Sequence, residues 1–249
     1  MIPKTIHYCW FGRNPLPDSA QKCIASWRKF FPDYEIIEWN EDNFDVNSIP
    51  YTEEAYATGK YAFVSDYARF KILYDNGGLY FDTDVEIIKT MDDIIANGSF
   101  MGFEINPDGN NFCGAVNPGL GLGVCKNDIL YKKILDSYRN IKFINPDGKY
   151  NLTTIVHYTT EILRLEGLSA DKKIQKINGI TIYPVDYFNP LNDNTGRLCI
   201  TVNTRSIHWY RKTWLDVHPI RTQISRLVHR IFGVNMIPKI RKVFTINHD

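Results

Sequence analysis

Apolar and polar positions follow two different repeats near the start of the chain. Residues 5–11 form an aromatic, β-prone run, and apolar residues recur at helical spacing between residues 20 and 31. We expect Asp18 or Ser19 to cap this helix, and residues 35–39 to form a second strand. A strand, a helix and a strand in this order predict a right-handed parallel unit at the N-terminus.

The remaining pattern continues this alternation of helices and strands. The predicted helices span residues 51–75, 91–96, 128–140 and 153–166, and the predicted strands span residues 79–81, 85–88, 100–103 and 180–183. Residues 104–123 are rich in glycine, asparagine and proline, so we expect a mobile loop over a site there. A chain of 249 residues fits one large α/β domain, which we place at residues 1–215, followed by a tail at residues 216–249.

Two carboxylates follow the apolar strand predicted at residues 79–81. Side chains alternate between the two faces of a strand, so Asp82 and Asp84 would project the same way. Two like charges at close range are unfavourable unless a cation neutralises them, and Mg²⁺ or Mn²⁺ binds carboxylates together with water and substrate phosphates. The spacing therefore indicates a metal site. A solvated strand end is the alternative, because an Asp-x-Asp pair alone is a weak motif.

The helix predicted before this strand carries Asp66 and Arg69 on one face, three residues apart. The simpler interpretation is an exposed ion pair, which would contribute only about 0.3 to 0.5 kcal/mol. The glycines at positions 119, 121 and 123 do not have dinucleotide-binding spacing, and the sequence contains no phosphate-binding P-loop motif. We therefore exclude a Rossmann dehydrogenase and a P-loop enzyme.

The charge distribution separates the C-terminal part from the rest of the chain. From residue 205 onward there are nine Lys or Arg against two Asp, although the whole chain has a formal charge of only +1. Residues 220–242 combine these cations with apolar positions at helical spacing. Such a basic amphipathic tail suits either an anionic membrane surface or packing against the domain.

Cysteine usage and hydropathy bear on the compartment. The five cysteines are odd in number and widely spaced, so we expect reduced thiols that mostly serve packing, and neither disulfides nor a zinc site. No apolar run approaches the length that spans a bilayer. We therefore expect a cytoplasmic protein, with the tail as a candidate for peripheral contact with the inner face of the cell membrane.

Four segments together resemble a known family. They read IPKTIHYCWFG at the start, SDYARFKILYDNGGLYFDTDVE in the middle, and YPVDYFNP and SIHWYRKTW later in the chain. Over roughly residues 1–214, the chain is similar to the glycosyltransferases of family 32, which include bacterial capsular-polysaccharide and Och1-like enzymes. More distantly, it resembles the glucosyltransferase domains of large clostridial toxins. The most specific part is the pattern S-D-x-x-R followed by G-G-x-Y-x-D-x-D.

The resemblance implies a GT-A fold, in which a Rossmann-like nucleotide-binding mixed sheet is flanked by helices, here as a single domain with a helical C-terminal tail. It also implies transfer of a hexose from a nucleotide sugar, with a UDP-sugar as the expected donor, and retention at the anomeric carbon. The acceptor would be a saccharide or a lipid-linked saccharide in the synthesis of capsular or other surface glycans. Nucleic acid is not an expected partner.

The same resemblance implies which residues do the chemistry. Asp66, Arg69, Asp82 and Asp84 would form the catalytic set. Asp66 and Arg69 would contact the donor sugar, and Asp82 and Asp84 would bind Mn²⁺ or Mg²⁺ at the diphosphate. Asp82 would also reach the ribose. No residue stands out as a nucleophile or general base, and we favour front-face transfer.

Four aromatic residues complete the implied site. Trp10 would stack on the base, Tyr80 would lie beside the donor, and Trp214 would help a C-terminal loop to close over it. His208 would be a further metal ligand. It matches the first histidine of an I-H-H pattern, whose second histidine is replaced here by Trp209.

Two other protein classes are open alternatives. One is a phosphohydrolase with Asp82 as nucleophile, although the strand that carries that nucleophile normally opens the domain. The other is a non-catalytic sugar-binding protein on a degenerate transferase scaffold. The intact set of three aspartates and one arginine favours an enzyme over this second class.

Overall fold

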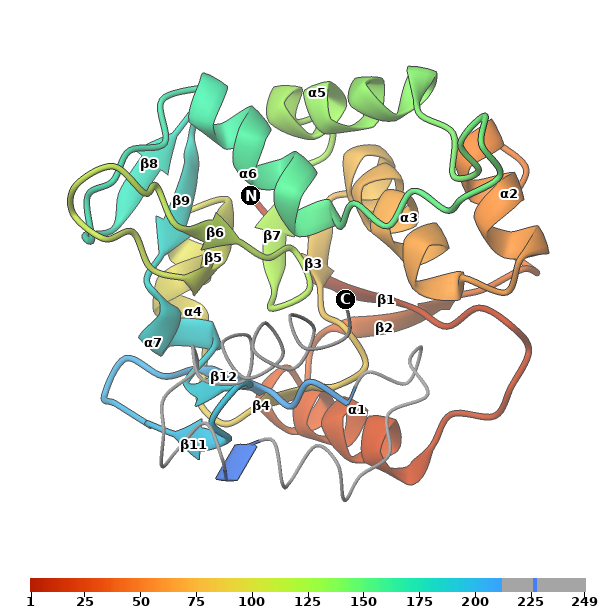
Figure 1. Cartoon of the computed structure of the whole chain (residues 1–249). Coiled ribbons are helices and arrows are strands. Elements are labelled where there is room, and N and C mark those ends of the chain that lie inside the picture. The colour runs from red at the N-terminus through yellow and green to blue at the C-terminus, as the bar shows by residue number, and fades with distance from the viewer. Residues whose placement is uncertain (212–225, 228–249) are drawn as a thin grey trace.

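The computed structural model describes residues 1–211 and 226–227, and its ribbon shows a mixed sheet with helices on both sides (Figure 1). The helices are α1 (Asp18–Phe30), α2 (Pro50–Ala57), α3 (Tyr61–Asn76), α4 (Asp92–Ala96), α5 (Ile129–Ser137), the 3₁₀ helix η1 (Tyr138–Asn140), α6 (Ile155–Leu165) and α7 (Val185–Phe188). The strands are β1 (Thr5–Cys9), β2 (Glu35–Trp39), β3 (Gly78–Tyr80), β4 (Val85–Ile87), β5 (Phe100–Ile105), β6 (Ala115–Val116), β7 (Leu122–Val124), β8 (Gln175–Ile177), β9 (Ile180–Tyr183), β10 (Leu191–Asn192), β11 (Arg197–Leu198) and β12 (Ser206–His208).

Within residues 1–211, eight strands form one mixed sheet in the order β2-β1-β3-β7-β5-β9-β8, with β6 paired to β5. β1 is parallel to β2 and to β3, which confirms the parallel pairing predicted at the N-terminus. β7 is antiparallel to both β3 and β5, so β1, β3 and β5 run in the same direction. The carboxyl ends of these three strands therefore share one edge of the sheet, where Trp10, Asp82 and Glu104 lie.

The start of α1 differs from expectation. Pro17 occupies the N-cap position and no side chain caps the helix, so the predicted cap at Asp18 or Ser19 is wrong. A proline fits this boundary because the first helical N–H groups have no intrahelical partner to lose. Asp18 lies in the first turn instead, where the helix dipole favours a carboxylate.

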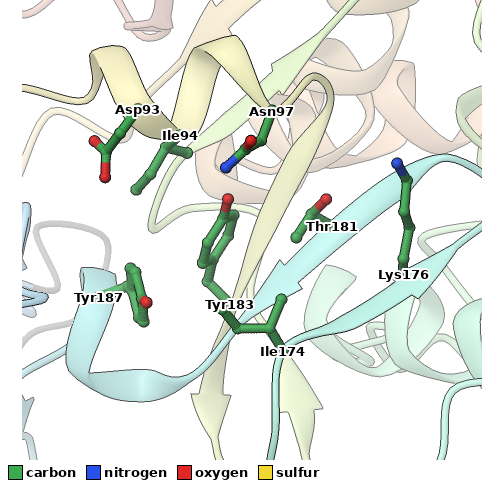
Figure 2. A pocket seen from close by; sticks show the side chains of 8 residues that line it. All are labelled: Asp93, Ile94, Asn97, Ile174, Lys176, Thr181, Tyr183 and Tyr187. Carbon is green, nitrogen blue, oxygen red and sulfur yellow. The ribbon is translucent and has the colours of Figure 1, made fainter.

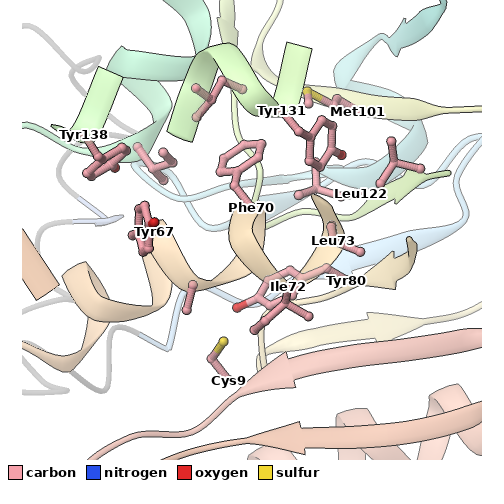
Figure 3. Close-up of a cluster of buried hydrophobic side chains, with 14 of the residues drawn as sticks. Cys9, Tyr67, Phe70, Ile72, Leu73, Tyr80, Met101, Leu122, Tyr131 and Tyr138 are labelled. Atoms are coloured by element: carbon pink, nitrogen blue, oxygen red, sulfur yellow. The ribbon is translucent and has the colours of Figure 1, made fainter. Parts of the chain in front are cut away.

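Apolar side chains fill both faces of the sheet. On one face, the rings of Phe70 in α3 and Tyr131 in α5 meet edge to face, with centroids 4.9 Å apart. Figure 3 shows Phe70 and Leu73 of α3 directed into this cluster. On the other face, α1 buries Trp27, whose indole donates a hydrogen bond to the carbonyl of Val85 at 2.7 Å. Helix α1 therefore packs against β4.

The loop expected over residues 104–123 is wrong in part, because β6 lies inside this range and β7, in the middle of the sheet, begins inside it. Glycine is unfavourable in strands on average, which is why the sequence did not predict a strand there. Here close packing requires it. A Cβ atom on Gly123 would overlap the ring of Phe100, and one on Gly121 would crowd the ring of Phe81.

A separate two-stranded sheet brings a late segment of the chain to the end of β3. β12 is antiparallel to β4, with His208 opposite Val85, and the backbone N–H of Trp209 donates to the carbonyl of Asp84 at 3.0 Å. Of the tail predicted at residues 216–249, the structure describes only residues 226 and 227, so the tail prediction lies outside the described residues.

Two further features concern the compartment. No helix in the described part of the chain is long and apolar enough to cross a bilayer. All five cysteines are free, but Cys9 and Cys23 alone among them are buried. Cys113 is partly buried and packs against the core, so three of the five cysteines serve packing, as expected.

Candidate active site

Helix α3 buries Asp66 and Arg69. Nη2 of Arg69 lies 2.9 Å from Oδ1 of Asp66, and the two side chains are only 5% and 11% exposed, in that order. The exposed ion pair that seemed the simpler interpretation is therefore wrong. Burial raises the pKa of Asp66 to about 6, although Arg69 acts in the opposite direction. A buried ion pair rarely adds stability over apolar packing, so this pair points to a functional role.

Arg69 also reaches the first carboxylate of the Asp-x-Asp pair. Its Nη1 lies 3.4 Å from Asp82, and the hydroxyl of Tyr80 donates to the same carboxylate at 3.1 Å. Burial alone would lower the pKa of Arg69, but Asp82 and Asp66 raise it above its ordinary value. Arg69 therefore stays charged and lies between two carboxylates that it neutralises in part.

Asp82 and Asp84 lie in a turn, not on a strand. β3 ends at Tyr80, and the N–H of Val85 donates to the carbonyl of Asp82 at 3.0 Å. The strand alternation expected for the two carboxylates is therefore the wrong explanation of their common direction. The turn brings them together instead.

His208 pairs with the second carboxylate. Its Nε2 lies 3.1 Å from Oδ1 of Asp84, and the backbone N–H of Arg211 donates to Oδ2 of Asp84 at 2.8 Å. Burial would raise the pKa of Asp84, but His208 lowers it below its ordinary value. Burial would likewise lower the pKa of His208, but Asp84 raises it above its ordinary value. The strand pairing of β12 with β4 creates this contact.

The three side chains fit a divalent cation. One ligand atom from each of Asp82, Asp84 and His208 lies within 4.8 Å of the other two. Two carboxylate oxygens and one imidazole nitrogen form a donor set that such ions accept. Nδ1 of His208 is buried without a partner among the described residues, so Nε2 is the nitrogen that faces the carboxylates. A cation at this position would replace the proton that the carboxylates hold on Nε2.

These groups open into a cavity of about 700 Å³. Seven of the eight residues predicted for the site line it: Trp10, Asp66, Arg69, Tyr80, Asp82, Asp84 and His208. The eighth, Trp214, lies outside the described residues. The indole of Trp10 donates to the carbonyl of Asn14 at 2.6 Å, which fixes the ring on the cavity wall.

The sequence did not point to several polar residues of this cavity. Glu104 of β5, Asn117 after β6 and Tyr210 after β12 all line it. No motif marks Glu104 or Asn117, and Tyr210 lies in the SIHWYRKTW segment without a role assigned to it. Asn117 shortly precedes the glycine-rich run, and that run is the only sequence feature near it that could have indicated the cavity.

At another point on the cavity wall, Arg226 from the C-terminal part donates to the carboxylate and to the carbonyl of Asp193, both at 3.0 Å.

A separate hollow of about 300 Å³ lies between α4 and strands β8 and β9 (Figure 2). In this view the hydroxyl of Tyr183 points toward α4, and Thr181 and Lys176 follow along the strands. None of the residues predicted for the site lines this hollow. The larger cavity is therefore the candidate active site.

Part of the chain is similar to a known protein family. Residues 17–101 match the family described as "Glycosyltransferase sugar-binding region containing DXD motif". This part of the chain is similar to that DXD family, in a match that covers about a third of the chain. The matched region contains Asp66, Arg69 and both aspartates of the DXD motif, Asp82 and Asp84.

Relatives of the DXD region include enzymes of yeast and virus. The chain is 32% identical over 98 residues to inositol phosphoceramide mannosyltransferase 3 of Schizosaccharomyces pombe, in a match that covers 38% of this chain and 27% of the yeast protein. The chain thus spans only about a quarter of that mannosyltransferase. It is 26% identical over 206 residues to an uncharacterized glycosyltransferase of Acanthamoeba polyphaga mimivirus, covering 80% of this chain and 77% of the viral protein.

A solved structure supports the fold of this chain. The PaToxG glycosyltransferase aligns with a TM-score of 0.51 and 21% identity, over 67% of this chain and 70% of its own. The expected GT-A architecture, a central mixed sheet flanked by helices, is therefore confirmed.

Proposed function

We propose that the protein is a retaining, metal-dependent glycosyltransferase that moves a hexose from a nucleotide sugar to a saccharide acceptor. The observation that carries this proposal is the meeting of Asp82, Asp84 and His208 with Arg69 on the wall of one cavity. A diphosphate leaving group requires positive charge at the point where it departs, and these residues are suited to supply it. The family match over residues 17–101 supports the same activity.

The donor side of the proposed site begins at Trp10. Its indole lies on the cavity wall at the end of β1, where a flat ring is suited to stack on a nucleotide base. Asp66 and Arg69 lie deeper, and we assign them to hydroxyl groups of the donor sugar. Tyr80 and Arg69 hold Asp82, which we assign to the ribose as well as to the metal. We take a UDP-sugar as the donor to be tested first.

The chemistry of the metal-ligating atoms also indicates which metal ion the protein uses. A bound divalent cation would neutralise charge on the diphosphate and so stabilise its departure. Mg²⁺ favours oxygen ligands and keeps several waters, whereas imidazole nitrogen is a better ligand for transition-metal ions. Because His208 supplies a nitrogen beside Asp82 and Asp84, we expect Mn²⁺ to bind more tightly than Mg²⁺.

The residues of the chain support front-face transfer. Arg69 is a buried positive charge 3.4 Å from Asp82, where negative charge would develop on the departing diphosphate. The acceptor hydroxyl would attack from the same face of the sugar, which retains the anomeric configuration. A glycosyl–enzyme adduct trapped and detected by mass spectrometry would contradict this route.

For the acceptor, we propose a saccharide or lipid-linked saccharide used in capsular or other surface-glycan synthesis. An enzyme of this kind would work in the cytoplasm, with its basic C-terminal segment on the inner membrane surface. The test is sedimentation with anionic vesicles. If a chain that ends near Pro219 sediments as the full chain does, the segment is not the anchor.

The experiment that tests the activity is nucleotide release from a panel of UDP- and GDP-sugars, with Mn²⁺, Mg²⁺ or EDTA. We expect slow hydrolysis of one donor that EDTA abolishes and that falls at least about 10²-fold in Asp84→Ala. Asp92→Ala removes an exposed carboxylate of α4, outside the cavity, and should leave the rate unchanged. A wild-type protein that neither binds nor hydrolyses any donor with metal present would contradict the proposed function.

A further inference from the structure

Glu104 occupies the same edge of the sheet as the DXD aspartates. β3 and β5 run in the same direction on either side of β7, and Asp82 and Glu104 lie at their carboxyl ends. Both side chains line the 700 Å³ cavity. The hydroxyl of Tyr210 donates to Glu104 at 3.2 Å, and the ring of Tyr210 lies against that of His208, with centroids 4.1 Å apart. A carboxylate outside the metal set therefore lies within reach of the donor site.

Its electrostatic environment differs from that of every other carboxylate on the cavity wall. Asp66 and Asp82 pair with Arg69, Asp84 pairs with His208, and Asp193 pairs with Arg226. Within residues 1–211 and 226–227, Glu104 has no cationic partner. Its hydrogen bonds come from neutral groups, the hydroxyl of Tyr210 at 3.2 Å and the amide of Asn117 at 3.4 Å. Among the cavity carboxylates in the described part of the chain, Glu104 is therefore the one without an ion-pair partner.

Neighbouring groups fix the orientation of this carboxylate. Tyr210 donates to Oε1 and in turn accepts from Nδ2 of Asn189 at 2.7 Å. Asn117 donates to Oε2, while its own Oδ1 accepts from the N–H of Gly119 at 2.7 Å. Gly119 lies directly against Asp82, so this network connects Glu104 to the metal side of the cavity. A carboxylate oxygen has two lone pairs, so each oxygen remains able to accept one more hydrogen bond.

We propose that Glu104 accepts the hydrogen bond, and then the proton, of the acceptor hydroxyl group. The inference rests on the proposed glycosyltransferase function. The acceptor oxygen forms a bond to C1 of the donor sugar while the bond from C1 to the diphosphate oxygen breaks, and that electron pair leaves with the diphosphate. The hydroxyl proton passes to Glu104, which becomes a neutral carboxylic acid and later returns the proton to water. Asp66, Asp82 and Asp84 are less suited to this task because their charges already face cations.

The role of Glu104 is tested with water and azide in place of the acceptor. The nucleotide sugar is the one that the wild-type protein hydrolyses. In Glu104→Ala we expect hydrolysis to fall about 10²-fold or more, because water must lose a proton as it attacks. Affinities for Mn²⁺ and for UDP, measured by calorimetry, should stay within about twofold. Azide has no proton to lose, so it should restore turnover at least about tenfold in the variant but not in the wild type. The expected product is a glycosyl azide with the donor's own anomeric configuration.

Two further variants distinguish loss of the carboxylate from a loss of stability and from a general change in charge. Glu104→Gln keeps the size of the side chain and should lose hydrolysis to a similar extent without a change in melting temperature. Glu53→Ala removes an exposed carboxylate of α2 and should change nothing.

Each remaining outcome is informative. Wild-type hydrolysis in both Glu104 variants, or a loss that azide does not rescue, would overturn the role in proton transfer. A glycosyl azide of inverted configuration would make Glu104 a nucleophile and would overturn the role as well. A wild-type protein that neither binds nor hydrolyses a donor would instead remove the transferase proposal on which the inference rests.

Discussion

Gly119 lies directly against the carboxylate of Asp82. A Cβ atom on Gly119 would overlap Oδ2 of Asp82, and the N–H of Asp82 donates to the carbonyl of Gly119 at 3.2 Å. Gly119 does not have a positive φ, so the space beside Asp82 is what requires glycine there. We expect Gly119→Ala to displace the Asp82 side chain and to weaken Mn²⁺ binding about 10- to 100-fold, as measured by calorimetry.

The matched control for this prediction is Gly123→Ala in the same glycine-rich run. Its new methyl group would overlap the ring of Phe100 inside the core and not the carboxylate. It should lower the free energy of unfolding by about 1 to 3 kcal/mol while Mn²⁺ affinity is unchanged. Equal effects of the two variants on metal binding would show that Gly119 acts through general stability alone.

Arg69→Lys should reduce donor turnover at least about 10²-fold. Lysine has one charged nitrogen and cannot hold Asp66 and Asp82 through two separate guanidinium nitrogens as Arg69 does. The same substitution at Arg164, which forms an exposed i,i+3 pair with Glu161, should have no effect on turnover and less than about 0.5 kcal/mol on stability. Steady-state kinetics of both variants on the hydrolysed donor make the comparison. Full activity in Arg69→Lys would remove Arg69 from the catalytic set.

His208→Asn should alter metal preference as well as affinity. We expect Mn²⁺ affinity to fall about 10- to 100-fold, because one of three protein ligands is lost, and Mg²⁺ affinity to fall less. Titration of both ions into the wild type and the variant measures the difference. His157→Asn changes an exposed histidine of α6 and is the control. If the preference for Mn²⁺ over Mg²⁺ is the same in His208→Asn and the wild type, His208 is not a ligand.

The parts of the fold that the sequence predicted are those where local pattern and packing agree. The N-terminal parallel unit has apolar residues at helical spacing in α1, and the structure confirms it. The helical stretch predicted at residues 51–75 ends before the Gly77-Gly78 pair as expected, but it forms two helices, α2 and α3. Spacing alone could not distinguish an exposed Asp66–Arg69 pair from a buried one, because burial depends on helices α5 and α6 from later in the chain. The same limit applies to β7 and to the residue before it, where contacts with Phe100 and Phe81 explain Gly123 and Gly121.

Some residues of the site could be predicted from local sequence and others could not, for a related reason. The DXD pair and Arg69 lie close together in sequence and form a recognisable pattern. Glu104 reaches the same cavity because β7 intervenes between β3 and β5, an order that no local motif encodes. His208 depends in the same way on the pairing of β12 with β4.

His7 should make stability depend on pH below neutrality. Its ring is buried in β1, with Nε2 donating to the carbonyl of Gly77 at 3.0 Å and Nδ1 accepting from the indole of Trp39 at 3.0 Å. Protonation of Nδ1 would break the bond from Trp39, and burial lowers the pKa of His7 to about 4, although the bond to Gly77 opposes the shift.

The unfolded chain, in which the histidine pKa is about 6.5, therefore binds the proton first as the pH falls. The contribution of neutral His7 is complete above pH 6.5 and is lost progressively between about 6.5 and 4, by about 3 kcal/mol in total. Urea unfolding at several pH values measures this slope. His7→Gln should lower the free energy of unfolding at every pH. It should also reduce the number of protons taken up on unfolding by about one between pH 6.5 and 4, so the free energy of unfolding depends less on pH. An unchanged slope would show that His7 is not the group responsible.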